Sequence, residues 1–404
     1  MWIYVWDSEI KWIYLWDTPV KEVYLWDTKI RPMIQPFWDT ITITWTETSD
    51  PTQFNPVWSD WADWAVAWDT RFDERFWYYA CHLNPSWVES DVVTQEASWW
   101  SWNLDMTRIA TRDWSDWKNV MIAFPIRWVK MSKSWSTVTL SMTKKLNETW
   151  YQYYAFNRNW TPKSILYLWA YKAAQSTEWW VQYLRSYSWI WAAYINNLSL
   201  DNACYLAQRN PWYDEITWYQ RQYINAMYMM KYWNPNAQDI VWCWNDQWSA
   251  QATWTTDNIL TATWATDKTS FSWHIKLFWL EDRWGNIGER ANWTYCNTTW
   301  TLLISSSQNF PSGRITSFDK SFYIPWWFIS SIVWTNDWMF VMNGGWWWTS
   351  TYYCDYVQQI YKKSSYLVWG FYGRNNYFWP FYARDDWPQY WSAQYWWRLM
   401  YLQP

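Results

Sequence analysis

The chain has 404 residues, and its net charge of −4 with a sequence pI near 5.4 excludes the basic surface field of a nucleic-acid-binding protein. The mean hydropathy is −0.49 and no apolar run reaches 18 residues, so we expect no membrane-spanning helix, and the first residues show no signal peptide. Five widely spaced cysteines, an odd number, argue against a disulfide framework and against a zinc site with paired ligand spacing.

The first thirty residues repeat with a period of ten. The units IYVWDSEI, IYLWDTPV and VYLWDTKI begin at Ile3, Ile13 and Val23. Each places a β-favouring triplet before a turn at Trp-Asp-Ser or Trp-Asp-Thr. Because so short a unit buries no core alone, the units are expected to pack on each other or on a partner. We interpret residues 1–36 as a small β module for attachment or assembly.

Residues 37–47 alternate threonine with isoleucine, which predicts a β-strand. The polar loop 48–58 follows and marks a candidate boundary. A β-rich pattern then continues to about residue 110. The region 37–114 is therefore predicted to be β-rich, and its residues indicate no function.

Two helices are predicted. The first covers 199–209, with Ser199 as N-cap and Asp201 in the first turn. The second runs from about Asp214 to Lys231, and we interpret its methionines as core residues. Its apolar residues fall at steps of three and four: Ile216, Tyr219, Tyr223, Ala226, Met227 and Met230.

Tryptophan is abundant and glycine scarce, with 53 Trp and 7 Gly where usual composition gives roughly 28 Gly. Asn159-Trp160, Asn292-Trp293, Asp337-Trp338 and Asp386-Trp387 stand where Asn-Gly and Asp-Gly turns normally fall, and such turns need a positive φ. We hypothesise an alternative genetic code, in which most of these codons are UGA and specify glycine in the source. Replacing all 53 tryptophans would give 60 glycines. That number is about twice the usual glycine content of a chain of this length, so some tryptophans are genuine. A truly Trp-rich protein is the alternative.

Several stretches after residue 115 match one family in order when glycine is restored. The most specific is WLEDRWGN, in which Trp279 stands for glycine and Glu281 precedes Trp284, Gly285 and Asn286. The chain thereby resembles the C-type-lectin-fold domain related to formylglycine-generating enzymes. That fold recurs in phage tail receptor-binding proteins and in the variable proteins of diversity-generating retroelements. The matching stretches are residues 121–131, 165–174, 215–233, 279–289, 350–356 and 398–402.

The resemblance implies an α+β fold in which a C-type-lectin-like domain at 115–404 follows the small β-rich N-terminal module. Residues 369–402 resemble the variable region of the retroelement proteins. The fixed elements there would be Trp369-Gly370, residues 379–382 and residues 396–399. In that family adenines are mutated, so asparagine codons never become Lys, Glu or Met, and none of these occurs between 371 and 397.

The candidate ligand-binding positions form a paratope-like mixture of aromatic and short polar residues. They are Phe371, Tyr372, Arg374, Asn375, Asn376, Tyr377, Arg384, Asp385, Asp386, Tyr390, Ser392 and Tyr395. The alternatives are that the aromatics pack within the last strands and that 384–386 is a solvated loop. For Leu399 and Tyr401, which alternate as in a strand, packing is the favoured interpretation.

The residues indicate no catalytic centre and no cofactor. Cys296 and Cys354 lack the reactive pair of formylglycine-generating enzymes, and His82 and His274 have no nucleophile or acid at motif spacing. The Trp-Asn-Asp run at 244–246 resembles a lectin calcium motif only if Trp244 is genuine. We therefore expect no enzyme activity and no metal.

The resemblance implies a non-enzymatic binding protein of a virion, a phage tail or a cell surface. Its partner would be a protein or glycan receptor on a cell surface. Self-association, for example as a trimer, or assembly with phage tail components is also expected. One alternative is a phage tail or virion structural protein with a fixed lectin-like domain, and a less favoured one is an oxidase of the formylglycine-generating kind.

Overall fold

The computed structural model describes a part of the chain, to which all structural statements refer. The described residues are 14–15, 18–19, 23–25, 28–30, 40–48, 57–58, 78–83, 89–93, 119–145, 150–178, 181–186, 205–207, 209, 213–232, 276–278, 280–281, 288–292, 294–296, 301–305, 318, 320–323, 327–335, 339–346, 356–358, 365–368, 383–386, 395–396 and 398–402.

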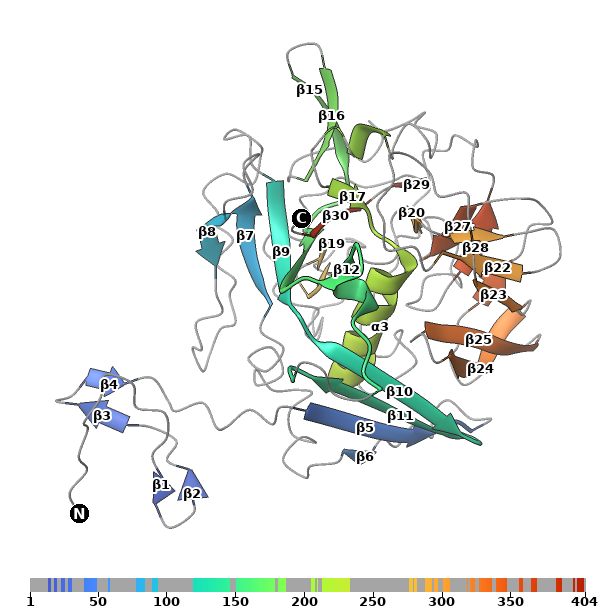
Figure 1. Cartoon of the computed structure of the whole chain (residues 1–404), viewed down its shortest axis with the longest axis horizontal. Helices are drawn as coiled ribbons and strands as arrows, with labels where there is room; N and C mark the ends of the chain where they lie inside the picture. The colour runs from blue at the N-terminus through green and yellow to red at the C-terminus, as the bar shows by residue number, and fades with distance from the viewer. Residues whose placement is uncertain are drawn as a thin grey trace, which may run out of the picture. The chain divides into compact units, whose positions relative to one another are not determined.

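The chain divides into two compact units, Met1–Thr40 and Ile41–Pro404. In the first unit, the second and third ten-residue repeats each contain one antiparallel hairpin, drawn in blue in Figure 1. Strand β1 (Tyr14–Leu15) pairs with β2 (Thr18–Pro19), and β3 (Val23–Leu25) pairs with β4 (Thr28–Ile30). The first repeat lies outside the described residues.

The described part of the second unit is mostly β-sheet with few helices, which agrees with the predicted α+β class. Its described helices are the 3-10 helix η4 (Tyr154–Phe156), the helical residues 205–207 and α3 (Trp218–Tyr232). No helix in the described part of the chain has the length and apolar character needed to cross a membrane.

A six-stranded sheet forms one side of the core and has the order β17-β30-β14-β9-β7-β8. Strand β30 lies inside this sheet, where Tyr401 pairs with Tyr167 of β14 and with Tyr213 of β17. Leu399 and Tyr401 are both buried, which confirms that they are packing residues. The strands are β7 (Tyr79–Leu83), β8 (Glu89–Val93), β9 (Asn119–Pro125), β14 (Ile165–Trp169), β17 (Tyr213–Glu215) and β30 (Leu399–Leu402).

A four-stranded sheet has the order β10-β11-β5-β6. In β5 (Thr40–Thr46), Ile41, Ile43 and Trp45 are buried and alternate with threonines, so the strand predicted at 37–47 is confirmed over 40–46. Residues 37–39 lie outside the described residues. The others are β6 (Val57–Trp58), β10 (Trp128–Ser134) and β11 (Thr137–Thr143). Strands from the region 37–114 thus belong to the same sheets as strands that follow residue 115.

The C-terminal third contributes a seven-stranded sheet of order β25-β24-β26-β28-β27-β20-β29 and a three-stranded sheet of order β21-β22-β23. The seven strands are β20 (Gly288–Arg290), β24 (Trp327–Thr335), β25 (Met339–Trp346), β26 (Tyr356–Gln358), β27 (Ser365–Val368), β28 (Ala383–Asp386) and β29 (Tyr395–Trp396). The three are β21 (Thr294–Cys296), β22 (Thr301–Ile304) and β23 (Lys320–Tyr323).

Three separate hairpins complete the described strands. They are β12 (Asn157–Arg158) with β13 (Thr161–Pro162), β15 (Ala174–Glu178) with β16 (Val181–Arg185), and β18 (Lys276–Leu277) with β19 (Leu280–Glu281).

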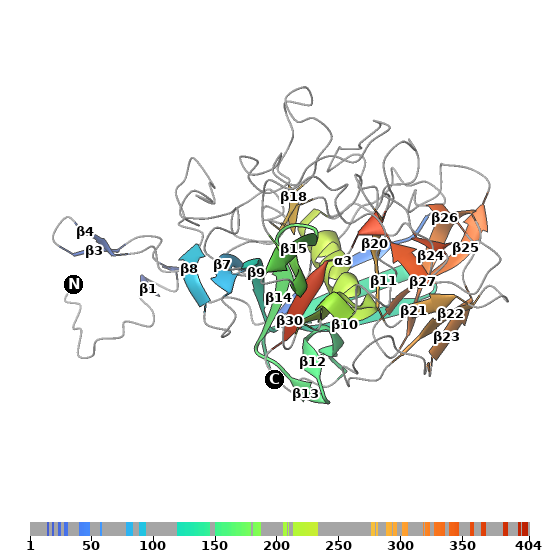
Figure 2. The ribbon, with the colours of Figure 1, turned by 90° about the horizontal axis from the view of Figure 1, so that it is seen from above.

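Helix α3 is the centre of the main core. In both ribbon views it lies between the six-stranded sheet and the orange strands of the seven-stranded sheet (Figures 1 and 2). Tyr223 stacks edge-on against Phe124 of β9 and Phe156 of η4, at centroid distances of 6.2 and 4.9 Å. Every residue from 218 to 230 is buried, which confirms that the methionines fill the core.

The start of α3 differs from the prediction, which placed it near Asp214. Residues 213–215 instead form β17, which pairs with β30, and the helix begins at Trp218. The Gln220 side chain accepts a hydrogen bond from the Thr217 backbone N–H at 3.0 Å, the reciprocal half of a capping box. Of the predicted helix at 199–209, residues 205–207 are helical, and most of the others lie outside the described residues.

The substitution Thr217→Ala is expected to lower the free energy of unfolding by about 1–2 kcal/mol, because it removes the hydroxyl that donates to Gln220 at the helix start. Thr217→Ser keeps the hydroxyl and should stay close to the parent. Urea denaturation of the two variants measures the difference. Equal losses in both would show that the methyl group of Thr217 matters and the cap does not.

Candidate functional site

The predicted ligand-binding positions are only partly described. Arg384, Asp385 and Asp386 lie in β28, and Tyr395 lies in β29. The others lie outside the described residues: Phe371, Tyr372, Arg374, Asn375, Asn376, Tyr377, Tyr390 and Ser392. The described part of the predicted variable region is therefore two strands of the seven-stranded sheet, followed by β30 of the six-stranded sheet.

Strand β28 is an interior strand. It runs antiparallel to β27, with Leu367 opposite Arg384, and parallel to β26, with Gln358 opposite Arg384. The run 384–386 is thus a strand and not the solvated loop that was the alternative. Its backbone is held by strands that precede the predicted variable region.

Strand β29 contains Tyr395, the last of the predicted variable positions, and pairs with β20. Tyr395 pairs with Gly288 and Trp396 pairs with Glu289, in a parallel arrangement. Two residues later, Arg398 enters the buried interior directly before β30. The chain therefore passes from the seven-stranded sheet to the six-stranded sheet at residues 396–399.

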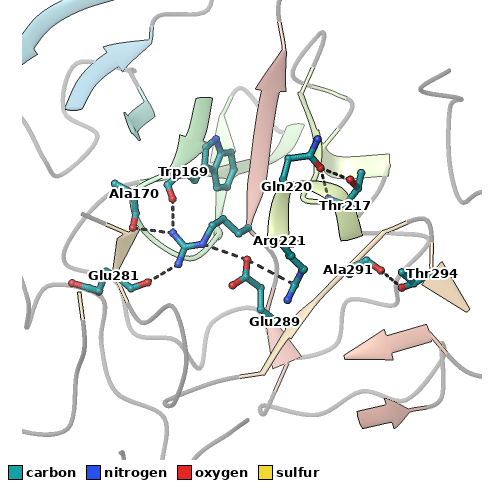
Figure 3. Close-up of polar contacts among 10 residues, drawn as sticks. Trp169, Ala170, Thr217, Gln220, Arg221, Glu281, Glu289, Ala291 and Thr294 are labelled. Atoms are coloured by element: carbon teal, nitrogen blue, oxygen red, sulfur yellow. Dashed lines mark hydrogen bonds and ion pairs between the residues drawn. The ribbon is translucent and has the colours of Figure 1, made fainter. Parts of the chain in front are cut away.

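Arg398 holds this crossing point through the backbone carbonyl groups of three residues that Figure 3 labels, Trp169, Ala170 and Glu281. Its Nη1 donates to the carbonyl oxygens of Trp169 and Ala170, the latter at 3.0 Å. Its Nη2 donates to the carbonyl oxygen of Glu281 at 2.5 Å. A planar guanidinium with several fixed donors suits such a site, whereas a lysine ammonium would not. We call Arg398 and these three carbonyls the Arg398 clamp.

A buried acid completes the arrangement. Glu289 of β20 lies with its Oε1 3.3 Å from Arg398 Nε and 3.9 Å from Nη2 of Arg221, which α3 contributes. All three side chains are at most 1% exposed. Burial lowers the pKa of Arg221 to about 9, and the nearby Glu289 carboxylate opposes that shift. The Arg221–Glu289–Arg398 triad therefore ties the central helix, β20 and β30 together.

A second buried acid lies beside β30. Asp214 of β17 accepts hydrogen bonds from the Glu215 backbone N–H at 2.8 Å and from Asn292 Nδ2 at 3.4 Å. Burial raises the pKa of Asp214 from 3.8 to about 7, although these donors and the charge of Arg158 oppose the shift. Arg158 in turn donates from Nη1 to the carbonyl oxygen of Leu402 at 2.6 Å. Both ends of β30 are thus held by a buried arginine.

Two tyrosines of the six-stranded sheet converge on one carboxylate. Tyr79 donates to Oε1 of Glu89 at 2.8 Å, and Tyr167 donates to the same oxygen. Burial and the Glu89 carboxylate raise the pKa of both tyrosines. These contacts connect β8, an edge strand of the sheet, to β7 and β14.

The residues considered for catalysis or metal binding show no assembled centre where they are described. Cys81 is buried, and burial raises the pKa of its thiol well above the usual value. His82 is also buried in β7, whereas His274 and Cys354 lie outside the described residues. In the described ranges, no group of three or more His, Cys, Asp and Glu residues could hold a metal ion.

The family motif at 279–289 is partly described. Glu281 is buried in β19, and its backbone carbonyl accepts from Arg398. Trp284, Gly285 and Asn286 lie outside the described residues. The sequence indicated Arg398 as part of a fixed element but gave no such indication for Arg221, which stands outside the apolar steps of the predicted helix, where other polar residues such as Gln222 are buried too.

No protein-family model matches the chain, and no curated protein matches it either.

Proposed function

We propose that the chain is a non-enzymatic binding protein whose C-terminal lectin-fold domain presents a diversified surface to a receptor. The receptor would be a protein or glycan on a cell surface, and the protein would belong to a virion, a phage tail or a cell surface. The observation that carries this proposal is the Arg398 clamp, which fixes the chain immediately after the predicted variable positions.

A diversified surface needs a scaffold that does not depend on the varied side chains. Arg398 bonds to backbone carbonyls, which stay the same whatever side chains precede it. Leu399, the last residue of the predicted fixed element 396–399, lies in the core, and so does Tyr401. These features support a segment 371–395 that can change its side chains between fixed ends.

The order of the described elements supports the lectin-like fold. The predicted family stretches at 121–131, 165–174, 215–233 and 398–402 fall on β9 with β10, on β14, on α3 and on β30. Strand β30 pairs with β14, so the terminal stretch meets an early stretch of the same domain. The order of the strands supports a fold and not a function. The proposed function rests on the Arg398 clamp and on the types of residue that precede it.

A fixed virion structural protein is the second candidate. The interior position of β28 favours it, because a strand paired on both sides tolerates fewer substitutions than a loop does. A template repeat beside a reverse-transcriptase gene would separate the two candidates.

Sequencing of codons 365–404 with flanks across a natural population tests the proposal. We expect substitutions only at adenine-derived positions between 371 and 395, with Arg398 and Leu399 invariant. An invariant segment would leave the fixed structural protein as the better reading.

A combined change of Tyr377, Arg384 and Asp386 to alanine is expected to abolish or redirect binding to receptor-bearing cells. In the proposed function these side chains face the receptor and not the core, so the melting temperature should change little, because surface substitutions usually cost less than about 0.5 kcal/mol. Binding is measured by flow cytometry with labelled protein, and stability by thermal unfolding of the same sample. A large loss of stability would show that these residues serve the core of the sheet.

A further inference from the structure

The two-residue turns that join described strands share one residue type. Six antiparallel pairs in the described ranges are joined by two residues only, as the registers Leu15–Thr18, Leu25–Thr28, Ser134–Thr137, Arg158–Thr161, Glu178–Val181 and Leu277–Leu280 require. Each connection contains a tryptophan. The connections are Trp16-Asp17, Trp26-Asp27, Trp135-Ser136, Asn159-Trp160, Trp179-Trp180 and Phe278-Trp279.

Two-residue connections of this kind select glycine for a steric reason. Their favoured forms, types I′ and II′, place one or both residues at a positive φ. There the Cβ of an L-residue collides with the backbone, and only glycine escapes this cost. Type I′ favours Asn-Gly, and type II′ takes glycine at the first of the two positions.

The backbone angles that the structure describes match these two forms. Asn159 and Trp160 have φ values of 51° and 62°, the pattern of an Asn-Gly type I′ turn. Trp135 has a φ of 56°, and its neighbour Ser136 is not among the described residues of positive φ, which is the pattern of type II′. In both turns tryptophan occupies the position that the turn reserves for glycine.

The rings at these positions gain no packing in return. Trp135 is 96% exposed, Trp160 is 63% exposed, and Trp150, with a φ of 71°, is 76% exposed. Trp45 shows the opposite behaviour, since it is 1% exposed within the extended strand β5. Among the described tryptophans, those of positive φ have exposed rings, and buried tryptophan in a strand is a separate class. Phe278, with a φ of 49° before Trp279, is buried and does not follow this division.

We propose that the tryptophans of the tight turns, together with Trp150, are glycines in the protein that the source cell makes. The codons at these positions are then UGA, decoded as glycine. The positions are Trp16, Trp26, Trp135, Trp150, Trp160, Trp179, Trp180 and Trp279. This assignment rests on turn geometry and is independent of the proposed function.

The three-residue connection between β24 and β25 also places a tryptophan where glycine is expected. Strands β24 and β25 are joined by the three residues 336–338, since Thr335 pairs with Met339. A three-residue hairpin loop ends with a residue in the left-handed region, most often glycine. Trp338 holds that third position.

Peptide mass spectrometry of the protein isolated from its natural source tests the assignment directly. Trypsin cleaves after Lys133 and Lys144 and after Arg158 and Lys163, which releases peptides 134–144 and 159–163. We expect the residue mass of glycine at positions 135 and 160. The mass of tryptophan at either position would overturn the assignment for that turn, and UGG codons in the gene would overturn the decoding.

Substitutions in the tryptophan-containing chain test whether these turns favour glycine for a steric reason. Trp135→Gly and Trp160→Gly should each increase the folding equilibrium constant about tenfold, because the backbone cost of the left-handed residue disappears. Trp135→Ala removes the exposed ring but keeps the Cβ, so it should gain much less. Trp45→Gly, the control in a strand, should lower the melting temperature. Equal gains from Trp135→Gly and Trp135→Ala would mean that ring exposure, and not the turn, is the cause, and would overturn the assignment.

Discussion

Arg398→Met is expected to lower the free energy of unfolding by about 3–5 kcal/mol, because it breaks a buried ion pair and removes the donors of three backbone carbonyls. It leaves the buried Glu289 carboxylate 3.9 Å from Arg221 and without the closer contact to Arg398. Binding through the upstream segment should be lost with the fold of β30. Urea denaturation of parent and variant gives the difference.

Arg209→Met is the matched control for Arg398→Met. Arg209 is only partly buried, and its guanidinium contacts the exposed Tyr205 hydroxyl at 3.2 Å, so its replacement should cost less than about 1 kcal/mol. The double variant Arg398→Met with Glu289→Leu should be less destabilised than the sum of the single variants, because the two partners are removed together. Only Arg221 then loses the Glu289 carboxylate, as it already does in Glu289→Leu alone. Strict additivity would show that the triad does not act as a unit.

Asp214→Asn should remove a pH dependence of stability that the parent shows between about pH 4 and pH 7. The pKa of Asp214 is raised from 3.8 to about 7 in the fold, so within this window the folded chain keeps a proton that the unfolded chain releases. Stability is therefore highest below pH 4, falls as the pH rises to 7 and is constant above. The rise in pKa corresponds to a loss of about 4 kcal/mol in the free energy of unfolding between pH 4 and pH 7.

Urea denaturation at several pH values between 3.5 and 8, a range set around the two pKa values of Asp214, measures this effect. Parent and Asp214→Asn should agree near pH 4, and the variant should be the more stable at pH 8. Asn292→Ala removes a hydrogen bond that lowers the pKa of Asp214, so the pH dependence should extend to a higher pH in that variant. A pH dependence that persists unchanged in Asp214→Asn would falsify the assignment to this carboxyl.

Local patterns in the sequence were sufficient for several elements of the fold. Alternation of threonine and isoleucine predicted β5 because one face of the strand is buried. Apolar steps of three and four predicted α3, but not its start, since Asp214 and Glu215 pair with residues far along the chain. Strand pairing over such distances leaves no periodic signal at either partner.

In the candidate site, too, local sequence patterns were informative and contacts between distant parts of the chain were not predicted. Arg398 was named as part of a fixed closing element, yet nothing near it indicates that its partners are Glu289 and the carbonyls of Trp169, Ala170 and Glu281. Those partners come from three different elements and meet only in the folded chain. The turn tryptophans could be recognised from the sequence, because a two-residue turn depends only on neighbouring residues. The pair Asn159-Trp160 predicted such a turn, and both residues have a positive φ.

The interior place of β30 has a consequence for biosynthesis. Strand β14 emerges from the ribosome early, but its neighbour Leu399–Leu402 is made only after every other described strand of the sheet. The six-stranded sheet is therefore completed after translation has passed residue 402, and such distant pairing is slow. If UGA codons occur along the message, a ribosome that stops at one of them releases a chain without β30. Such a fragment lacks the strand between β14 and β17, so incomplete products should be cleared by proteolysis and should not compete with the full-length protein.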